Sequence, residues 1–275
     1  VCTSSREMRK SFERLAKLLP PGVTPVYQTR PFGDQVELAA KSRVPAMVRA
    51  LACEHPEGRR GVATVAPCCS TQFHIGVPNM LSDPGMLFFN ILNNSAPHAR
   101  LKVIDFYKVK GAEGHLAIWK GWANKDRLPA PRWFHSAGDM RQFIRGIPKL
   151  LTKRKVEGGE DEWVQVYREM SRLTDPESIG TIWWEARPRF WPDSKFDPYT
   201  VEWRCFPSLQ PHQAVDLANE LIQIKEAFDA YLPRMRRWNR ESGSVAELYR
   251  HLSERSYLIP PEPLEDHRWW ELFHK

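Results

Sequence analysis

Two adjacent segments within residues 182–206 share one alternating pattern, and this pattern constrains the fold more than any other part of the sequence. In residues 183–190, and again in residues 199–206, apolar side chains alternate with charged or polar ones. Successive side chains of a strand point to opposite faces, so a period of two predicts two strands that each have an apolar face and a polar face. The polar positions are Glu185, Arg187, Arg189, Thr200, Glu202 and Arg204.

The connection between these segments, residues 190–198, is rich in Pro and Asp and predicts an ordered loop between antiparallel strands. If both polar faces line one surface, carboxylates and guanidiniums converge there, as they do where a protein holds a metal-bound polyphosphate. The alternative is a solvated sheet face with cross-strand ion pairs. Taken alone, the two segments slightly favour this alternative.

A third segment, residues 71–77, has the same design. Phe73, Ile75 and Val77 share one face of the predicted strand with Thr71, which leaves the intervening residues on the opposite face. Those opposite residues are Gln72, His74 and Gly76. Three strands are therefore expected to combine core residues on one side with polar groups on the other.

Helical spacing and capping residues predict helices between and around these strands. We expect helices at residues 4–19, 41–53, 84–92, 136–151, 163–173, 211–232, 245–252 and 269–273, and a further strand at residues 23–32. The helix that begins at residue 84 is expected to stop at the Asn-Asn-Ser-Ala-Pro run of residues 93–97. Residues 100–131 show little periodicity and are interpreted as a substrate loop.

Composition limits the class of protein. The chain has 275 residues, of which 42% are hydrophobic and 11 are Trp, so it can bury the core of a large folded domain. No run approaches the roughly 20 apolar residues that span a bilayer, and the first residues lack an apolar signal core. Because the chain begins with Val, we expect that something upstream has been removed or omitted. We expect no membrane partner.

The number and spacing of the cysteines, and the net charge, further limit the class of protein to which the chain can belong. Five Cys, with Cys68 and Cys69 adjacent, fit neither a disulfide framework nor a zinc site, so a reduced, cytoplasmic protein is predicted. The net charge of +7 includes basic clusters at residues 149–155 and 234–240. Both clusters are short and belong to no known binding motif, so a basic surface near an anionic substrate, or a solvated face, is favoured over nucleic-acid binding. A homo-oligomer is compatible with the sequence.

The motifs TQFHIGV, NNSAP, IWWEARPRF and TVEWRCF, in this order and spacing, resemble the glutamate–cysteine ligase family. They are most similar to its bacterial carboxylate–amine ligase branch, which is distantly similar to glutamine synthetase. The RPFGDQ turn and Arg43 also resemble family elements, and the likeness spans roughly residues 30–232. It implies an α+β fold of the glutamine synthetase type, with a mainly antiparallel sheet that has a polar catalytic face and helices packed on the other face. Residues 1–232 would form the ligase-like domain, without the family's first strand, and residues 233–275 a C-terminal helical extension of it.

The resemblance implies an ATP-dependent ligase that forms an amide bond through an acyl phosphate, with Mg²⁺ or Mn²⁺ as cofactor. Glu202 and His74 match the metal ligands of the family, and Arg204 and Arg187 match residues that contact the transferring phosphoryl group. Further nucleotide- or substrate-binding positions are Gln72, Glu185, Arg189, Asn94, Trp119 and Lys120. Because Trp119 falls where the family has an Arg that holds the substrate carboxylate, a different acid from glutamate is expected, such as an aromatic or specialised metabolite.

Each of these residues also has a purely structural interpretation. His74 would then be a half-buried, hydrogen-bonded histidine, and Gln72 a polar sheet residue. Arg187 would pair with Glu185 or with Glu202 across the strands. Cys69 and Cys205 are interpreted as core thiols. In that case the chain would be a catalytically degenerate relative that acts as a basic binding or partner-dependent protein.

Overall fold

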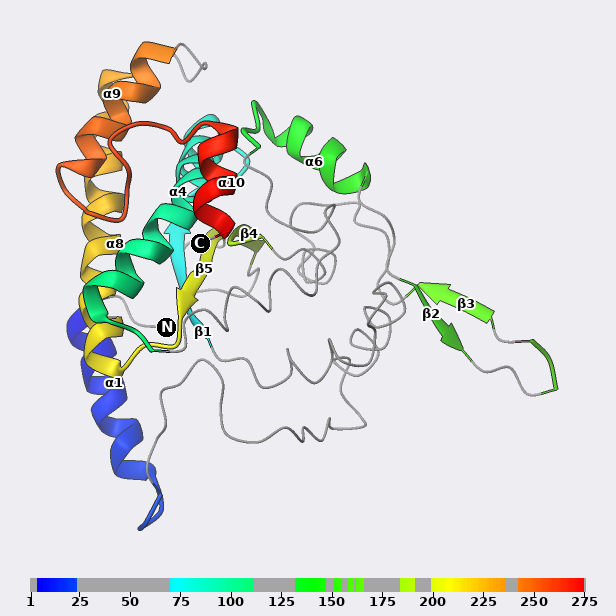
Figure 1. Cartoon of the computed structure of the whole chain (residues 1–275), viewed down its shortest axis with the longest axis vertical. Helices are drawn as coiled ribbons and strands as arrows, with labels where there is room; N and C mark the ends of the chain where they lie inside the picture. The colour runs from blue at the N-terminus through cyan, green and yellow to red at the C-terminus, as the bar shows by residue number, and fades with distance from the viewer. Residues whose placement is uncertain are drawn as a thin grey trace.

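A three-stranded antiparallel sheet is packed against the long helices of the molecule (Figure 1). The computed structural model describes residues 4–23, 70–110, 132–146, 151–154, 158–160, 162–165, 184–190, 199–235 and 242–274. The strand order is β1 (Ser70–Val77), β5 (Tyr199–Pro207), β4 (Ala186–Phe190). Helices and an antiparallel sheet together confirm the expected α+β class, and the two strands expected in residues 182–206 pair with each other.

The register of this sheet brings polar residues from three parts of the sequence into line. Residues directly opposite one another form rows across the three strands, and successive rows face opposite sides of the sheet. The polar rows are His74–Glu202–Arg187 and Gly76–Thr200–Arg189; the apolar rows are Phe73–Trp203–Ala186 and Ile75–Val201–Pro188. The alternation expected from the sequence is therefore confirmed for these rows. We call the side that carries the polar rows the polar face.

Helix α4 (Asp83–Tyr107) packs against β4 and β5 and supplies much of the core. Ser82 caps its first turn, since its Oγ accepts the Gly85 N–H at 3.3 Å. The expected end at residues 93–97 is wrong, because the helix continues through Pro97 to Tyr107. Pro97 lacks the N–H that would bond the Asn93 carbonyl. That carbonyl accepts the indole N–H of Trp269 at 3.4 Å instead, so tertiary contacts overcome the local stop signal.

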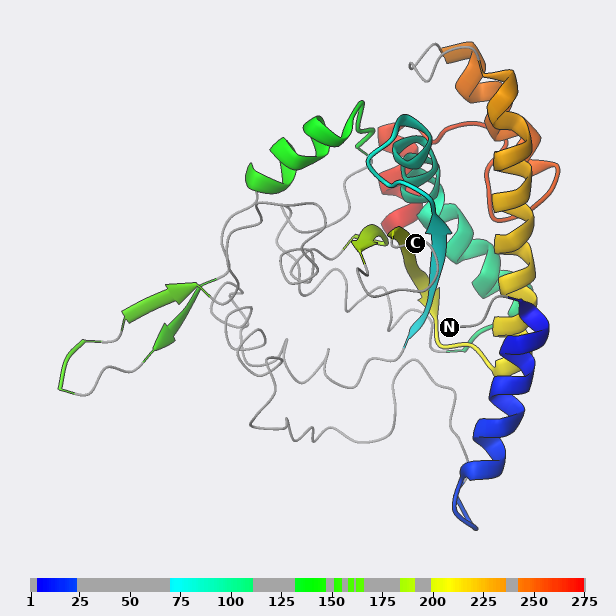
Figure 2. The same cartoon turned by 180° about the vertical axis from the view of Figure 1, so that it is seen from behind.

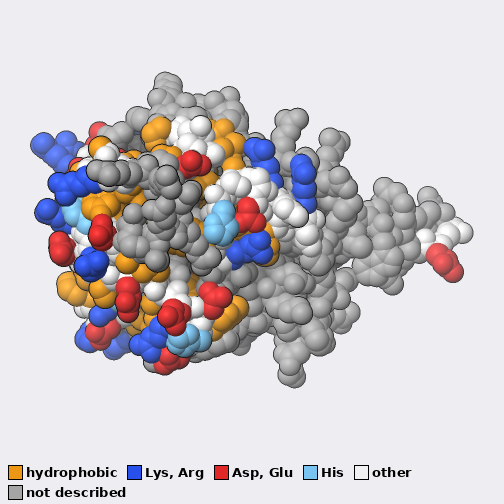
Figure 3. Space-filling model, turned by 90° about the horizontal axis from the view of Figure 1, so that it is seen from above, with side chains coloured by type: hydrophobic (Ala, Val, Ile, Leu, Met, Phe, Trp, Pro, Cys, Tyr) orange, Lys and Arg blue, Asp and Glu red, His pale blue; other side chains and the backbone are white. Residues whose placement is uncertain are grey.

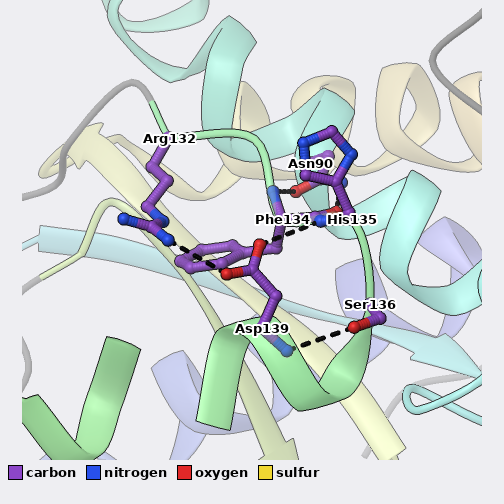
Figure 4. Close-up of polar contacts among 6 residues, drawn as sticks. All are labelled: Asn90, Arg132, Phe134, His135, Ser136 and Asp139. Carbon is purple, nitrogen blue, oxygen red and sulfur yellow. Dashed lines mark hydrogen bonds and ion pairs between the residues drawn. The ribbon is translucent and has the colours of Figure 1, made fainter. Parts of the chain in front are cut away.

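The side-chain amides of two asparagines on α4 form hydrogen bonds with the backbone of other segments of the chain. Asn90 donates to the Phe134 carbonyl at 2.7 Å and accepts the Phe134 N–H at 3.1 Å (Figure 4). Asn94 binds Leu264 in the same way, with both hydrogen bonds at 2.9 Å. Each amide therefore satisfies both backbone groups of one residue, as a neighbouring strand would.

Helix α6 (Ala137–Gly146) begins directly after the segment that Asn90 holds. Ser136 is its cap, because its Oγ accepts the Asp139 N–H at 3.1 Å, and Asp139 in turn pairs with Arg132 at 3.0 Å (Figure 4). The described part of this helix extends to Gly146, and the expected end at residue 151 is wrong because that residue lies in a strand. Residues 151 and 163–165 lie in strands instead: β2 (Leu151–Arg154) and β3 (Glu162–Gln165) form an antiparallel pair. A short apolar run is compatible with either a strand or a helix. In these two segments the pairing of β2 with β3 stabilises the strand conformation.

The remaining helices lie on the side of the molecule away from the β2–β3 pair (Figures 1 and 2). Helix α1 (Ser5–Leu18), capped by Ser4, packs on α8 (Pro211–Tyr231), which is followed by η1 (Leu232–Arg234). Helix α9 (Ser242–Ser253) packs on α8, and α10 (Asp266–His274) packs on α4. The helices expected at residues 4–19, 211–232, 245–252 and 269–273 are thus confirmed. The strand expected at residues 23–32 and the helix at 41–53 lie outside the described residues.

The substrate loop expected at residues 100–131 lies only partly within the described residues, and its first part is helical because α4 extends to Tyr107. None of the helices in the described ranges combines the length and the apolar character that are needed to cross a membrane.

Candidate functional site

The carboxylate of Glu202 lies at the centre of the polar face. The Arg187 Nε donates to Glu202 Oε2 at 2.6 Å, and the Arg187 Nη2 donates to Oε1 at 3.3 Å. The Arg189 Nε lies 3.1 Å from the same Oε2. Of the two partners considered for Arg187, the structure therefore selects Glu202, on the neighbouring strand. Bidentate pairing of this kind fixes both side chains in direction as well as in distance.

The polar face is not the solvated surface that cross-strand ion pairs alone would suggest. Only 2% of Glu202, 8% of Arg187 and 7% of Arg204 is exposed. Removing charged groups from water costs several kcal/mol per ion, and their mutual attraction repays this only in part. A cluster of two buried arginines, one partly buried arginine and one buried glutamate therefore costs folding free energy.

The protonation states of this face follow from its charges. Burial alone would raise the pKa of Glu202, but the hydrogen bonds and charge of Arg187, with the charges of Arg204 and Arg189, lower it. Glu202 is thus ionised at neutral pH. Burial is the main cause that lowers the pKa of His74, and the nearby arginines add to it, although Glu202 acts in the opposite direction. The imidazole is therefore neutral at neutral pH, with Nδ1 3.2 Å from Thr200 Oγ1, and it keeps contact with solvent.

Glu185 is not part of the Glu202 cluster. It precedes β4, and its carboxylate forms an ion pair with Arg100 of α4; 0% of Glu185 and 1% of Arg100 is exposed. Burial raises the pKa of Glu185, and Arg100 only partly offsets this. Arg100 also donates to the Leu272 carbonyl of α10 at 3.2 Å. The Glu185 carbonyl accepts the Arg204 N–H at 2.8 Å, so this buried pair is joined to the site strand β5.

Arg100 was missed by the sequence interpretation. Its signal is a charged residue in an apolar helix, and that signal was hidden because the helix was expected to stop before Pro97. If the predicted helix had been extended past Pro97, Arg100 would have been placed on it, two turns after Asn93. The structure shows that this helix is buried over most of its length. A buried arginine requires a carboxylate partner, which the sequence alone does not name.

The structure places the other predicted site residues in different surroundings. The exposed Gln72 donates to Ser70 Oγ at 3.1 Å. Asn94 is buried and is hydrogen-bonded to the Leu264 backbone. Trp119 and Lys120 lie outside the described residues. Cys205 is a buried free thiol on the apolar side of β5, as expected, and burial raises its pKa. Cys69 also lies outside the described residues.

His74 and Glu202 stand opposite one another in the register, as a shared metal site would require. Within the described part of the chain, however, no group of three His, Cys, Asp or Glu side chains is close enough to hold a metal ion. Both Glu202 oxygens already bind guanidinium groups. A metal ion at this position would therefore need other ligands, such as phosphate oxygens and water, and a displacement of the arginines.

The described residues define an α+β protein with a small antiparallel sheet, one face of which carries an arginine-rich, largely buried charged cluster. Comparison with models of known protein families, with curated proteins and with solved structures finds no match for this chain.

Proposed function

We propose that the chain is an ATP-dependent carboxylate–amine ligase of the glutamate–cysteine ligase type, with a glutamine synthetase-like fold and the polar face as its active site. The observation that supports this most is the cluster of the buried Arg187, Arg204 and Glu202 with the partly buried Arg189, beside a neutral His74. Such a cluster costs folding free energy, and costly charged groups are concentrated at functional sites. The reaction would join an acid and an amine, at least one of them an amino acid or related metabolite, through an acyl phosphate in the cytoplasm.

The residue types fit the charges of this reaction. Fixed guanidiniums of Arg187 and Arg204 would bind phosphate oxygens and stabilise the charge that develops during phosphoryl transfer. Glu202 and His74 would provide a carboxylate and a neutral imidazole for Mg²⁺. Mg²⁺ commonly takes one or two carboxylates together with phosphates and water, so this small ligand set is sufficient when the nucleotide supplies the rest. When bound, the ion would neutralise part of the polyphosphate charge.

This proposal assigns two states to the arginines. In the structure Arg187 and Arg189 bind Glu202. With nucleotide and metal bound, Glu202 would turn to the cation and the guanidiniums to the phosphates. The exchange keeps every charged group partnered, which is the condition for burying such groups at low cost.

A second candidate is a catalytically degenerate binding protein. The observation in its favour is that Glu202 is neutralised by two arginines. In that case the face would hold an anion, or only stabilise the sheet, without transferring a phosphoryl group.

The deciding experiment measures release of ADP and phosphate with ATP and Mg²⁺ across a panel of carboxylic acids and amines. Glu202→Gln removes the charge and keeps the shape, and the exposed Lys17→Met of α1 is the control for loss of a charge elsewhere. Turnover that requires both an acid and an amine, is lost in Glu202→Gln and persists in Lys17→Met would support the ligase. Binding of ATP without turnover would favour the second candidate. If no nucleotide binds, the ligase proposal is wrong.

A further inference from the structure

A second candidate binding site lies between α4 and the segment that leads into α10, apart from the polar face. It is a cleft of about 1030 Å³. This size is at the upper end of the range in which proteins bind drug-sized ligands. One side is α4 with Leu101 and Lys102, and the other is the proline-rich segment of residues 260–266. Trp133, which is partly buried, contributes an aromatic side chain.

Hydrogen bonds fix the two sides of this cleft relative to each other. Asn94 of α4 binds both backbone groups of Leu264, and Tyr249 donates to the same Asn94 Oδ1 at 3.0 Å. The Trp269 indole N–H bonds the Asn93 carbonyl one turn into α10. The cleft is thus preformed, which lowers the entropy that a ligand must lose when it binds.

The cleft lining carries charges of both signs, and Asp105, Arg132, Glu265 and Arg268 are each in an ion pair. The charged lining residues that make no ion pair with another described residue have opposite signs on the two sides of the cleft. Lys102, on α4, makes no ion pair with any other described residue. Glu262 and Asp266, on the opposite segment, likewise have no ion-pair partner among the residues that the structure covers. The lining between them includes the apolar side chains of Leu101, Trp133, Leu264 and Leu272. Seen from above, acidic, basic and hydrophobic side chains are interspersed on the described part of the surface (Figure 3).

His98 adds a hydrogen-bonding group to the α4 side. Its Nε2 lies 3.2 Å from the Tyr257 carbonyl, which can only accept, so Nε2 carries the proton. Burial lowers the pKa of His98, and the charge of Lys102 adds to this effect. The ring is therefore neutral, and its Nδ1 is an acceptor that suits the N–H of an amide.

We propose that this cleft binds a short apolar peptide with free termini. The peptide carboxylate would pair with Lys102, its ammonium group with Glu262 and Asp266, and its side chains would contact Leu101 and Trp133. A ligand with one charge, or with none, would leave one side of the cleft without a partner. This inference does not depend on the ligase activity proposed for the polar face.

The test is calorimetric titration of the whole chain with the tripeptide Leu-Phe-Leu in four forms: free, N-acetylated, C-amidated and blocked at both ends. An exposed ion pair contributes up to about 1 kcal/mol, so blocking either end should weaken binding about fivefold and blocking both about 25-fold. Lys102→Met should reduce the affinity for the free peptide to that of the amidated peptide, without changing the affinity for the amidated one. Glu262→Gln combined with Asp266→Asn should reduce the affinity for the free peptide to that of the acetylated peptide, without changing the affinity for the acetylated one.

Two matched controls separate this cleft from other surfaces. Lys17→Met removes an exposed lysine on α1 and should leave all four affinities unchanged. Arg189→Met alters the polar face only, so loss of peptide binding in that variant, with binding intact in Lys102→Met, would overturn the proposal. Equal affinity for all four peptides, or no saturable binding of the free one, would overturn it as well. These outcomes are independent of whether ADP is released.

Discussion

The buried ion pair between Arg100 and Glu185 leads to a quantitative prediction for Arg100→Met. Both side chains are almost wholly inside the protein, so removing the arginine leaves a carboxylate without its ion-pair partner in a low-dielectric environment. Breaking a buried pair in this way costs about 3–5 kcal/mol. About 1 kcal/mol more is expected from the lost hydrogen bond to the Leu272 carbonyl. The sum is a large part of the roughly 5–15 kcal/mol that stabilises a folded domain.

The pH dependence of this loss identifies its cause. Burial already raises the pKa of Glu185, and loss of Arg100 removes the larger of the two charges that oppose this effect, so that only the smaller effect of Arg204 remains. Between the unfolded pKa of about 4.3 and the raised folded pKa, the folded carboxyl keeps a proton that the unfolded chain releases. Stability of the variant therefore falls as pH rises through this window, by up to about 1.4 kcal/mol per pH unit. Below the window the carboxyl is protonated in both states, and this part of the loss is absent.

Urea unfolding of the wild type, Arg100→Met and Arg100→Met/Glu185→Gln at about pH 5 and about pH 8 tests this reasoning. The double variant has no charge at positions 100 and 185, so its free energy of unfolding should exceed that of the single variant at the higher pH. At the lower pH the two variants should approach each other, because Glu185 is then protonated. An equal loss at both pH values, without rescue in the double variant, would refute the reasoning.

Three further predictions concern α4 and the segments that it holds. Gly85→Ala should lower the free energy of unfolding by about 1–3 kcal/mol, because a Cβ there would lie 2.8 Å from a backbone carbon of the preceding turn; Gly138→Ala, whose Cβ would meet no atom closer than 3.5 Å, is the matched control in thermal unfolding. Asn94→Ala should cost about 2–3 kcal/mol by leaving the Leu264 backbone without partners, and limited proteolysis should then release α10; an unchanged digestion pattern would contradict this. Lys108→Gly should stabilise the protein by about 1 kcal/mol, because residue 108 ends α4 with φ at 50°; a lower midpoint of thermal unfolding would count against it.

The strands of the three-stranded sheet were predictable because side-chain alternation directly encodes the two faces of a sheet, whereas β2 and β3, which lack this pattern, were expected to be helical at residues 151 and 163–165. The pattern of Arg187 and Glu202 indicated a shared polar face, and the register confirms that they stand opposite each other. The depth of that face was not predictable, since burial depends on segments that are distant in sequence. The ion pair of Glu185 with Arg100 was hidden for the same reason.

The extent of α4 shows where local signals fail. The Asn-Asn-Ser-Ala-Pro run disfavours a helix in isolation, because Pro97 removes a hydrogen bond and asparagine competes for backbone groups. In the folded protein the freed Asn93 carbonyl and the Asn94 amide find partners in the last part of the described chain. Residues that predict the end of a helix are thus the ones that form hydrogen bonds with segments distant in sequence.

The attachments of α4 also have a consequence for synthesis of the protein. The Asn93 carbonyl, the Asn94 amide and the Arg100 guanidinium are bonded by residues that lie between 170 and 176 positions later in the chain. At translation rates of about 5–20 residues per second, the ribosome needs roughly 9–35 s to reach them. During this interval water, or a chaperone, must satisfy polar groups that the finished protein buries. The helix at the centre of the fold is therefore made long before the residues that complete it.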